Sequence, residues 1–197
     1  MREVELKGVA LDPAATRLAL TNAGFRCTFR GSIVDRRYDT ETFALQQRDE
    51  VVRVRVTTGA PGPMARVEFK GAASYPSGFK VRDEIGSSVD DVAAVERIFH
   101  ALGLRVTREI ERDIEIYEGV GATVRFETYP RMDVLLEVEG EPPAIEWAIA
   151  RTGIPRASFT AERLSDFVRR FESRTGERAA LCAREQQGDF RYRLDDT

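Results

Sequence analysis

Six short stretches of this chain alternate apolar and charged residues with a period of two, and no other feature constrains the fold as strongly. Successive side chains of a β-strand point to opposite faces, so each stretch predicts a strand with one apolar and one charged face. The stretches are residues 2–8, 51–56, 65–70, 79–85, 123–127 and 134–139. We expect further strands near residues 30–38, 43–47 and 105–117, which gives an antiparallel sheet of eight or nine strands.

Four helices are expected beside these strands. The first begins at Asp12-Pro13, an N-cap followed by proline at the first helical position, and runs to Gly24 with Ala15, Leu18 and Leu20 buried. The second spans residues 88–103, the third begins at residues 142–143, and the fourth follows residues 158–160. The simplest arrangement docks these helices on the apolar side of the sheet, which makes the fold class α+β.

The charged side of the sheet faces either bulk water or the inside of a closed barrel. Charged residues on a half-exposed sheet are usually solvated, which favours bulk water. Eight or nine antiparallel strands tend to curl and close, however, and nearly every polar position here carries a full charge. Inside a barrel such charges must pair with one another or hold a polyanion together with its cations. The six charged faces supply seven acids and eight bases: Glu3, Glu5, Glu68, Glu84, Glu127, Glu137 and Glu139, with Lys7, Arg53, Arg55, Arg66, Lys70, Lys80, Arg82 and Arg125.

Length and composition exclude several classes of protein. The 197 residues, 42% of them hydrophobic, fit one domain, which we place at residues 1–185 with a polar C-terminal tail at 186–197. Thirty Lys and Arg against thirty-three Asp and Glu argue against a nucleic-acid partner. A single histidine, His100, and two cysteines, Cys27 and Cys182, rule out a His-rich metal site, a zinc motif and a disulfide scaffold. No apolar run reaches membrane-spanning length and no signal peptide is evident, so we expect a cytoplasmic protein without a membrane partner.

Several charged motifs follow one another along the chain in a fixed order. Glu3, Glu5 and Lys7 form an E-x-E-x-K signature. Residues 35–40 are similar to D-x-Y-Y/F-D-T, 52–55 to L-R-x-R, 68–71 to Y-K-G, 82–84 to R-x-E, and 137–139 to E-x-E. In this order the motifs resemble the CYTH superfamily, the triphosphate tunnel metalloenzymes, which include class IV adenylyl cyclases, thiamine triphosphatases and inorganic tripolyphosphatases.

This resemblance implies a fold and a set of site residues. The fold is a closed antiparallel β-barrel of about eight strands that forms a tunnel, with helices packed outside. Mg²⁺ or Mn²⁺ is the implied cofactor, and Lys7 and Glu5 are the implied catalytic residues. The implied metal ligands are Glu3, Glu5, Glu127, Glu137 and Glu139. The implied triphosphate-binding residues are Lys7, Arg53, Arg55, Lys70, Arg82, Arg112 and Arg125.

Three positions depart from the family pattern. Glu127 stands where the family usually has Asp, and Arg37 replaces an aromatic residue, an exchange that we interpret as minor. Ile114 occupies the position of the second base in a K-x-R pair whose first base is Arg112, and Arg125 on the next strand is a candidate substitute. On the same strand Glu109, Glu111, Asp113 and Glu115 are expected to form a solvated outer face, while isoleucines fill part of the tunnel.

The expected function is metal-dependent processing of a small molecule that carries a triphosphate. Hydrolysis is the leading interpretation, because it needs only a triphosphate and a positioned water. A class IV adenylyl cyclase, making cyclic AMP and pyrophosphate from ATP, is the alternative. A non-catalytic module that binds polyphosphate or a phosphorylated ligand is the second alternative, supported by Ile114. A homodimer is left open.

Overall fold

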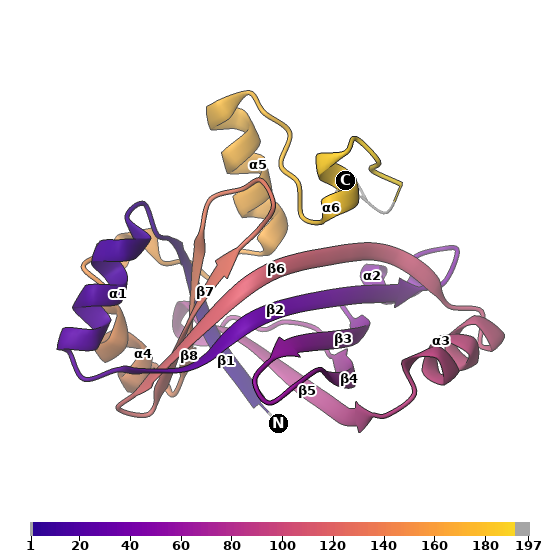
Figure 1. Ribbon diagram of the computed structural model, residues 1–197, viewed down its shortest axis with the longest axis horizontal. Coiled ribbons are helices and arrows are strands. Elements are labelled where there is room, and N and C mark those ends of the chain that lie inside the picture. Colours follow the sequence, from indigo (N-terminus) through magenta and orange to yellow (C-terminus); the bar gives the residue numbers. More distant parts are fainter. Residues whose placement is uncertain (1, 192–197) are drawn as a thin grey trace.

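The barrel is closed and contains eight antiparallel strands, with helices on its outside (Figure 1). The structure is a computed structural model that describes residues 2–191, so residues 192–197 of the expected tail lie outside the described residues. The strands are β1 (Arg2–Val9), β2 (Arg26–Asp39), β3 (Val51–Gly59), β4 (Met64–Lys70), β5 (Lys80–Val89), β6 (Arg105–Gly119), β7 (Ala122–Thr128) and β8 (Leu135–Gly140). Their order around the barrel is β1-β5-β4-β3-β2-β6-β7-β8, and β8 pairs with β1 to close it. The predicted α+β class and closed barrel are therefore confirmed.

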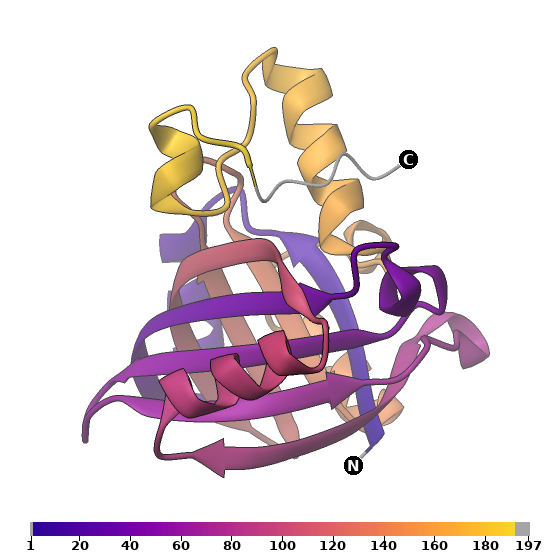
Figure 2. The ribbon, with the colours of Figure 1, turned by 90° about the vertical axis from the view of Figure 1, so that its right-hand side faces the viewer.

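The described helices lie outside the barrel wall or over its openings. They are α1 (Pro13–Asn22), α2 (Ala44–Gln47), α3 (Val92–Ala101), α4 (Pro142–Ile149), α5 (Leu164–Thr175) and α6 (Ala183–Gln186), with short 3₁₀ turns at Pro76–Gly78 and Arg156–Ser158. In Figure 1, α1 and α4 lie together at one end, and α3 lies at the opposite end. Figure 2 shows α3 across the outside of the strands, with α5 and α6 above the barrel.

Two hydrophobic clusters attach these helices to the barrel. In the first, the fully buried Leu20 of α1 and Ile145 of α4 pack against the outer apolar faces of β1, β7 and β8, through residues such as Leu136. In the second, Phe167 and Phe171 of α5 pack against inward-pointing Ile110 and against Leu135. Because Ile110 also lines the barrel interior, α5 partly covers one opening of the barrel.

Some sequence-based expectations about individual elements were wrong. Residues 43–47 are not a strand, because the Asp39 carboxylate accepts hydrogen bonds from the backbone N–H groups of Leu45 and Gln46 and so folds them into α2. In α1 Thr16 and Leu20 are buried, whereas Ala15 and Leu18 are exposed. The helix expected at 88–103 begins only at Val92, because β5 continues to residue 89.

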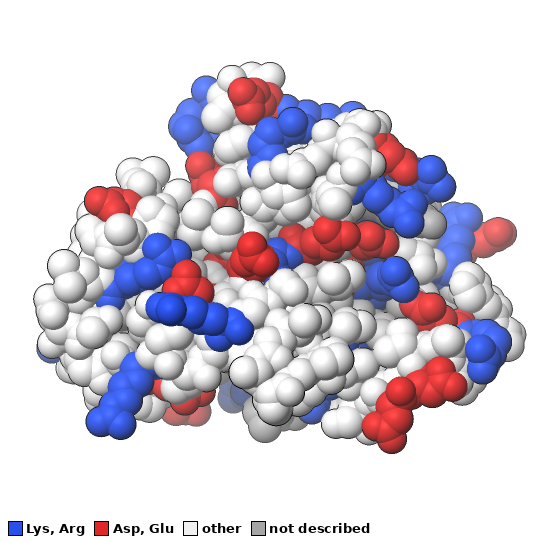
Figure 3. All heavy atoms as spheres, viewed as in Figure 1, with Lys and Arg blue, Asp and Glu red and all other residues white. Residues whose placement is uncertain are grey.

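The outer face of β6 is only partly solvated. Glu109 is buried beneath Arg36 and Arg184, and the Glu111 carboxylate accepts the backbone N–H of Ala183 at 3.0 Å. Glu115 pairs with Arg17 at 2.7 Å. The acidic outer face therefore anchors neighbouring elements, and Figure 3 shows acidic and basic side chains interspersed on this side of the molecule. Within residues 2–191, none of the helices has the length and apolar character needed to cross a membrane.

Candidate functional site

The barrel encloses a cavity of about 910 Å³ with a strongly charged lining. Twelve Lys and Arg side chains and eight Asp and Glu side chains line it, so bases exceed acids by four. They come from all eight strands, from the loop after α2, and from the beginning of α5 and the residue before it. The period-two strands place charges inside because their apolar faces pack outward against the helices. Of the two readings left open by the sequence, the barrel interior is the one observed.

Three carboxylates gather where β1 pairs with its neighbours. Glu5 of β1 and Glu139 of β8 are register partners, and Glu3 lies two positions before Glu5 on the same face. One carboxylate oxygen from each of the three lies within 4.8 Å of the other two. Carboxylate oxygens are the ligands that Mg²⁺ and Mn²⁺ prefer, so this donor set fits the metal implied by the resemblance.

The charges around this cluster keep two of its carboxylates ionised. Burial alone raises the pKa of Glu5, but the ammonium groups of Lys7 and Lys80 hold that pKa well below its ordinary value. Burial also raises the pKa of Glu3, but a hydrogen bond from Glu84 and the charge of Lys70 lower it to about 2. A metal ligand must be deprotonated, so both groups are ready to bind a cation at neutral pH.

The other two predicted metal ligands lie outside this cluster. Glu137 forms ion pairs with Lys7 and Arg125. Glu127 is buried and accepts hydrogen bonds from Arg112 Nε at 2.8 Å and from the Tyr129 hydroxyl at 2.7 Å. The structure therefore groups three of the five predicted carboxylates and places the remaining two against cations.

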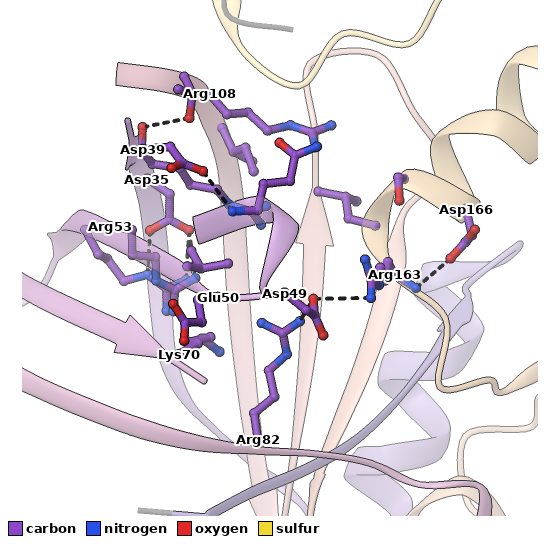
Figure 4. A pocket seen from close by; sticks show the side chains of 18 of the residues that line it. Asp35, Asp39, Asp49, Glu50, Arg53, Lys70, Arg82, Arg108, Arg163 and Asp166 are labelled. Atoms are coloured by element: carbon purple, nitrogen blue, oxygen red, sulfur yellow. Dashed lines mark hydrogen bonds and ion pairs between the residues drawn. The ribbon is translucent and has the colours of Figure 1, made fainter. Parts of the chain in front are cut away.

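Three predicted phosphate-binding arginines converge on one buried acid, Asp35. Its carboxylate accepts hydrogen bonds from Arg55 Nε at 2.7 Å, Arg112 Nη1 at 3.0 Å and Arg53 Nη1 at 3.3 Å. Arg53 also donates to Glu68 at 2.6 Å. Figure 4 shows Asp35 and Arg53 on the same wall of the cavity. The acid holds the guanidinium groups in place, and their number exceeds what one carboxylate can neutralise.

The remaining predicted phosphate-binding residues also line the cavity. Lys70 pairs with Glu3 at 2.9 Å, and Lys7 donates to Glu5 at 3.1 Å. Arg125 points inward from β7 and reaches Glu139 at 3.1 Å. Arg82 instead binds Asp49 at 2.6 Å, and Asp49 also pairs with Arg163 just before α5. Figure 4 shows Arg82 and Arg163 converging on Asp49.

The missing base of the K-x-R pair leaves an apolar position in the wall. Ile114 is 3% exposed and is the register partner of Glu127. Ile110, four residues earlier on the same face of β6, borders the cavity directly. The predicted partial filling of the tunnel by isoleucines is therefore observed at this strand.

Five cations line the cavity outside the predicted phosphate-binding set: Arg37, Lys80, Arg108, Arg163 and Arg169. Arg37 was interpreted as a minor exchange, and Arg108 fell in no motif. Both line the cavity, and they are register partners on β2 and β6. Burial, followed by the charges of Arg108 and Arg53, lowers the pKa of Arg37 to about 9. The alternation of β2 could have identified Arg37 as inward-facing, because Arg37 lies two positions after Asp35 on the same face of the strand.

Comparisons with known proteins give matches among solved structures only. No family model and no curated protein matches this sequence. The protein PH1819 from Pyrococcus horikoshii OT3 is 21% identical, with a TM-score of 0.71 over 82% of this chain and 94% of that chain. A provisionally assigned adenylate cyclase from Vibrio parahaemolyticus is 15% identical, with a TM-score of 0.69 over 85% and 97%.

A third similar structure is HpAC1 from Hippeastrum. It is provisionally assigned as an adenylyl cyclase and reveals a dominant triphosphatase activity. It is 14% identical, with a TM-score of 0.59 over 91% of this chain and 98% of that chain. All three identities are below 25%, so the likeness concerns the fold. The barrel that the motifs predict is thus also the fold of proteins assigned to nucleotide or triphosphate chemistry.

Proposed function

We propose that this protein is a phosphohydrolase of the CYTH superfamily, dependent on Mg²⁺ or Mn²⁺, that releases the terminal phosphate of a small triphosphate-containing molecule. One observation carries the proposal. The three-carboxylate cluster reaches, through Glu5, a cavity that is lined by an excess of Lys and Arg. Hard cations and a phosphate chain together need both sets of charges, whereas either set alone is costly to bury.

The carboxylates and the cations divide the work of binding. Glu3, Glu5 and Glu139 would hold the metal, which when bound supplies charge neutralisation to phosphate oxygens and lowers the pKa of a bound water. On the opposite wall Arg53, Arg55 and Arg112 would donate to the phosphate chain. Since these groups are already fixed by Asp35, they need little reorganisation when negative charge grows in the transition state.

Lys7 lies at the boundary between these two groups. Its ammonium donates to Glu5 and pairs with Glu137, and it also lines the cavity. From this position it would hold an oxygen of the terminal phosphate while Glu5 stays beside it to orient the attacking water. Truncating Lys7 is therefore expected to lower the rate more than it weakens ground-state binding.

Hydrolysis is preferred over cyclisation because of the character of the lining. The described aromatic side chains that border the cavity are Tyr38, Phe43 and Tyr129. Tyr129 is engaged by Glu127, and Tyr38 by Glu96 and by the Phe99 ring outside the barrel. A nucleoside-specific pocket usually offers apolar or aromatic surface to the base, and this lining offers mainly charge. The dominant triphosphatase activity of the similar HpAC1 supports the same preference.

Phosphorus NMR of the purified protein tests the proposal. The protein is incubated with Mg²⁺ or Mn²⁺ and with tripolyphosphate or ATP in separate tubes. We expect orthophosphate from at least one substrate, and no release when the metal is chelated. Pyrophosphate with cyclic AMP from ATP would instead identify a cyclase, and absence of turnover with retained phosphate binding would identify a binding module.

A pair of variants ties the activity to the carboxylate cluster. Glu139→Gln removes one member of the cluster while the more deeply buried Glu5 and its lysine partners stay intact. We expect it to reduce metal-dependent turnover by about 100-fold, the scale seen when a charge-stabilising group is removed. Glu118→Gln, an exposed position on β6, is the matched control and should retain full activity. Unchanged turnover in Glu139→Gln would contradict the proposed metal site.

A further inference from the structure

Three arginines form a row across neighbouring strands of the barrel. Arg37 of β2 is the register partner of Arg53 on β3 and of Arg108 on β6. All three line the cavity. Side chains of register partners on the same face lie about 5 Å apart at their Cβ atoms, and like charges placed so are destabilising. Such a row is not expected in a barrel interior unless an anion belongs beside it.

The middle member of the row, Arg37, has no direct ion-pair partner among the described residues. Arg53 has Glu68 and Asp35, but among residues 2–191 the side chain of Arg37 has no hydrogen-bond or ion-pair partner, and its Nε is buried without an acceptor. Guanidinium carries five N–H donors and keeps its charge in proteins, so this arrangement is costly in the absence of a ligand.

Two acids, Asp35 and Asp39, each lie two positions from Arg37 on β2, and neither forms an ion pair with it. The Asp35 carboxylate is occupied by the three arginines described above. Asp39 uses its two carboxylate oxygens for backbone N–H groups, accepting from Thr40 at 2.7 Å, Leu45 at 2.9 Å and Gln46 at 2.9 Å. These bonds build α2 at the mouth of the cavity, and Figure 4 shows Asp39 beside Arg108 on the wall that also carries Asp35 and Arg53. Among residues 2–191, therefore, no carboxylate forms an ion pair with Arg37, and the position is open to a bound anion.

The row does not simply replace the missing base at position 114. Arg108 and Ile114 are six residues apart on β6, which is about 20 Å along a strand. The row instead continues from Arg112, through their shared acid Asp35, to Arg53 and then to Arg37. It extends the set of phosphate-binding cations toward the α2 mouth.

We propose that the row of Arg37, Arg53 and Arg108 holds a further phosphate beyond the three of a triphosphate, so that the preferred substrate is a phosphate chain of four or more units. This inference rests on the proposed function, because it takes the rest of the cavity to hold a triphosphate. An inorganic polyphosphate and a nucleoside tetraphosphate share the required chemistry, since both present a fourth phosphate with its negative charge.

Calorimetric titration without metal tests chain-length preference separately from turnover. The probes are tripolyphosphate, tetrapolyphosphate and adenosine 5′-tetraphosphate. They are titrated into the wild type, Arg37→Gln and the control Arg30→Gln, an arginine with an exposed side chain on the same strand. We expect the wild type to bind tetrapolyphosphate about tenfold more tightly than tripolyphosphate, from one additional charge-assisted contact. Arg37→Gln should abolish this preference and change tripolyphosphate affinity by less than about twofold, while Arg30→Gln should behave as the wild type.

The outcomes separate this inference from the proposed function. Equal wild-type affinity for the two inorganic chains, alongside hydrolysis of tripolyphosphate, would overturn the inference alone. Failure of every chain to bind would overturn the inference, and the proposed function falls with it only if no chain is hydrolysed in the presence of metal. Equal weakening of both chains by Arg37→Gln would also contradict a fourth-phosphate site. Tight binding of adenosine tetraphosphate would show that the row accepts the phosphate of either source, and weak binding would restrict it to inorganic chains.

The thermal midpoint of the ligand-free protein distinguishes a ligand-binding role of Arg37 from a structural one. Because Arg37 has no partner among the described residues, Arg37→Gln should leave the thermal midpoint of the ligand-free protein unchanged or raised. A fall of several degrees in that midpoint would mean that Arg37 stabilises the fold, and it would count against the proposed site.

Discussion

Replacing Asp35 by Asn should destabilise the ligand-free barrel strongly, for a reason that lies in the site. The carboxylate is 1% exposed and accepts hydrogen bonds from Arg53, Arg55 and Arg112. Burial raises the pKa of Asp35, yet the three guanidinium groups hold that pKa well below its usual range. The carboxylate is therefore ionised and neutralises charge at neutral pH, and an amide of the same shape removes that charge.

The expected size of the effect follows from the burial of the network. Removing one member of a buried ion pair costs about 3–5 kcal/mol, because the remaining charges stay buried without compensation. For a chain of this length each kcal/mol lowers the thermal midpoint by about 2–4 °C, so Asp35→Asn should lower it by roughly 10 °C. Asp113→Asn, on the exposed face of β6, should change stability by less than about 0.5 kcal/mol.

Added tripolyphosphate distinguishes a phosphate site from a purely structural network. If the arginines bind phosphate, the ligand replaces the missing negative charge and stabilises Asp35→Asn more than it stabilises the wild type. Chemical denaturation with and without tripolyphosphate measures both effects. A loss below about 1 kcal/mol in the variant, or equal stabilisation of the two proteins by the ligand, would refute this reasoning.

Three further predictions concern Glu127, the metal and the core. The pKa of Glu127 is lowered from 4.5 to about 2, so its charge stabilises the fold fully above pH 4.5 and progressively less as the pH falls toward 2. The wild type should therefore exceed Glu127→Gln in stability by about 3 kcal/mol at neutral pH, and this difference should shrink over that pH range in acid titrations followed by circular dichroism. Mg²⁺ at about 100 times its Kd should stabilise the wild type by about 2.7 kcal/mol in thermal melts, and Glu139→Gln should lose most of this gain while Glu118→Gln keeps it. Leu20→Ala should cost about 2–5 kcal/mol in urea denaturation because Leu20 is 0% exposed, and a cost below 1 kcal/mol would mean that α1 is not held by this contact.

Much of the barrel and part of the site could be predicted from the alternation of residues. The period of two places Arg53 and Arg55 on one face of β3, and only one face of a packed sheet can be apolar. The grouping of Glu5 with Glu139 could not be predicted from alternation alone, because it depends on the pairing of β8 with β1. Here the order of motifs and their family resemblance supplied the missing tertiary information.

Other features depend on contacts that no local pattern reveals. Residues 43–47 look apolar enough for a strand, but hydrogen bonds to Asp39 turn them into α2. The separation of Glu137 from the three-carboxylate cluster arises because Lys7 and Arg125 both reach it. Such choices among several nearby partners depend on side-chain reach inside the closed barrel, and spacing along the chain does not determine them.

Because β1 pairs with β8, the three-carboxylate cluster can form only late in folding. A growing chain that has not yet completed β8 carries Glu3 and Glu5 but lacks Glu139, the third carboxylate of the cluster. Contacts between such distant segments form late, because loop-closure entropy opposes them until the intervening strands are ordered. If the cluster binds a metal as proposed, metal affinity is acquired only when β8 closes the barrel, and the metal would stabilise the finished barrel without nucleating its folding.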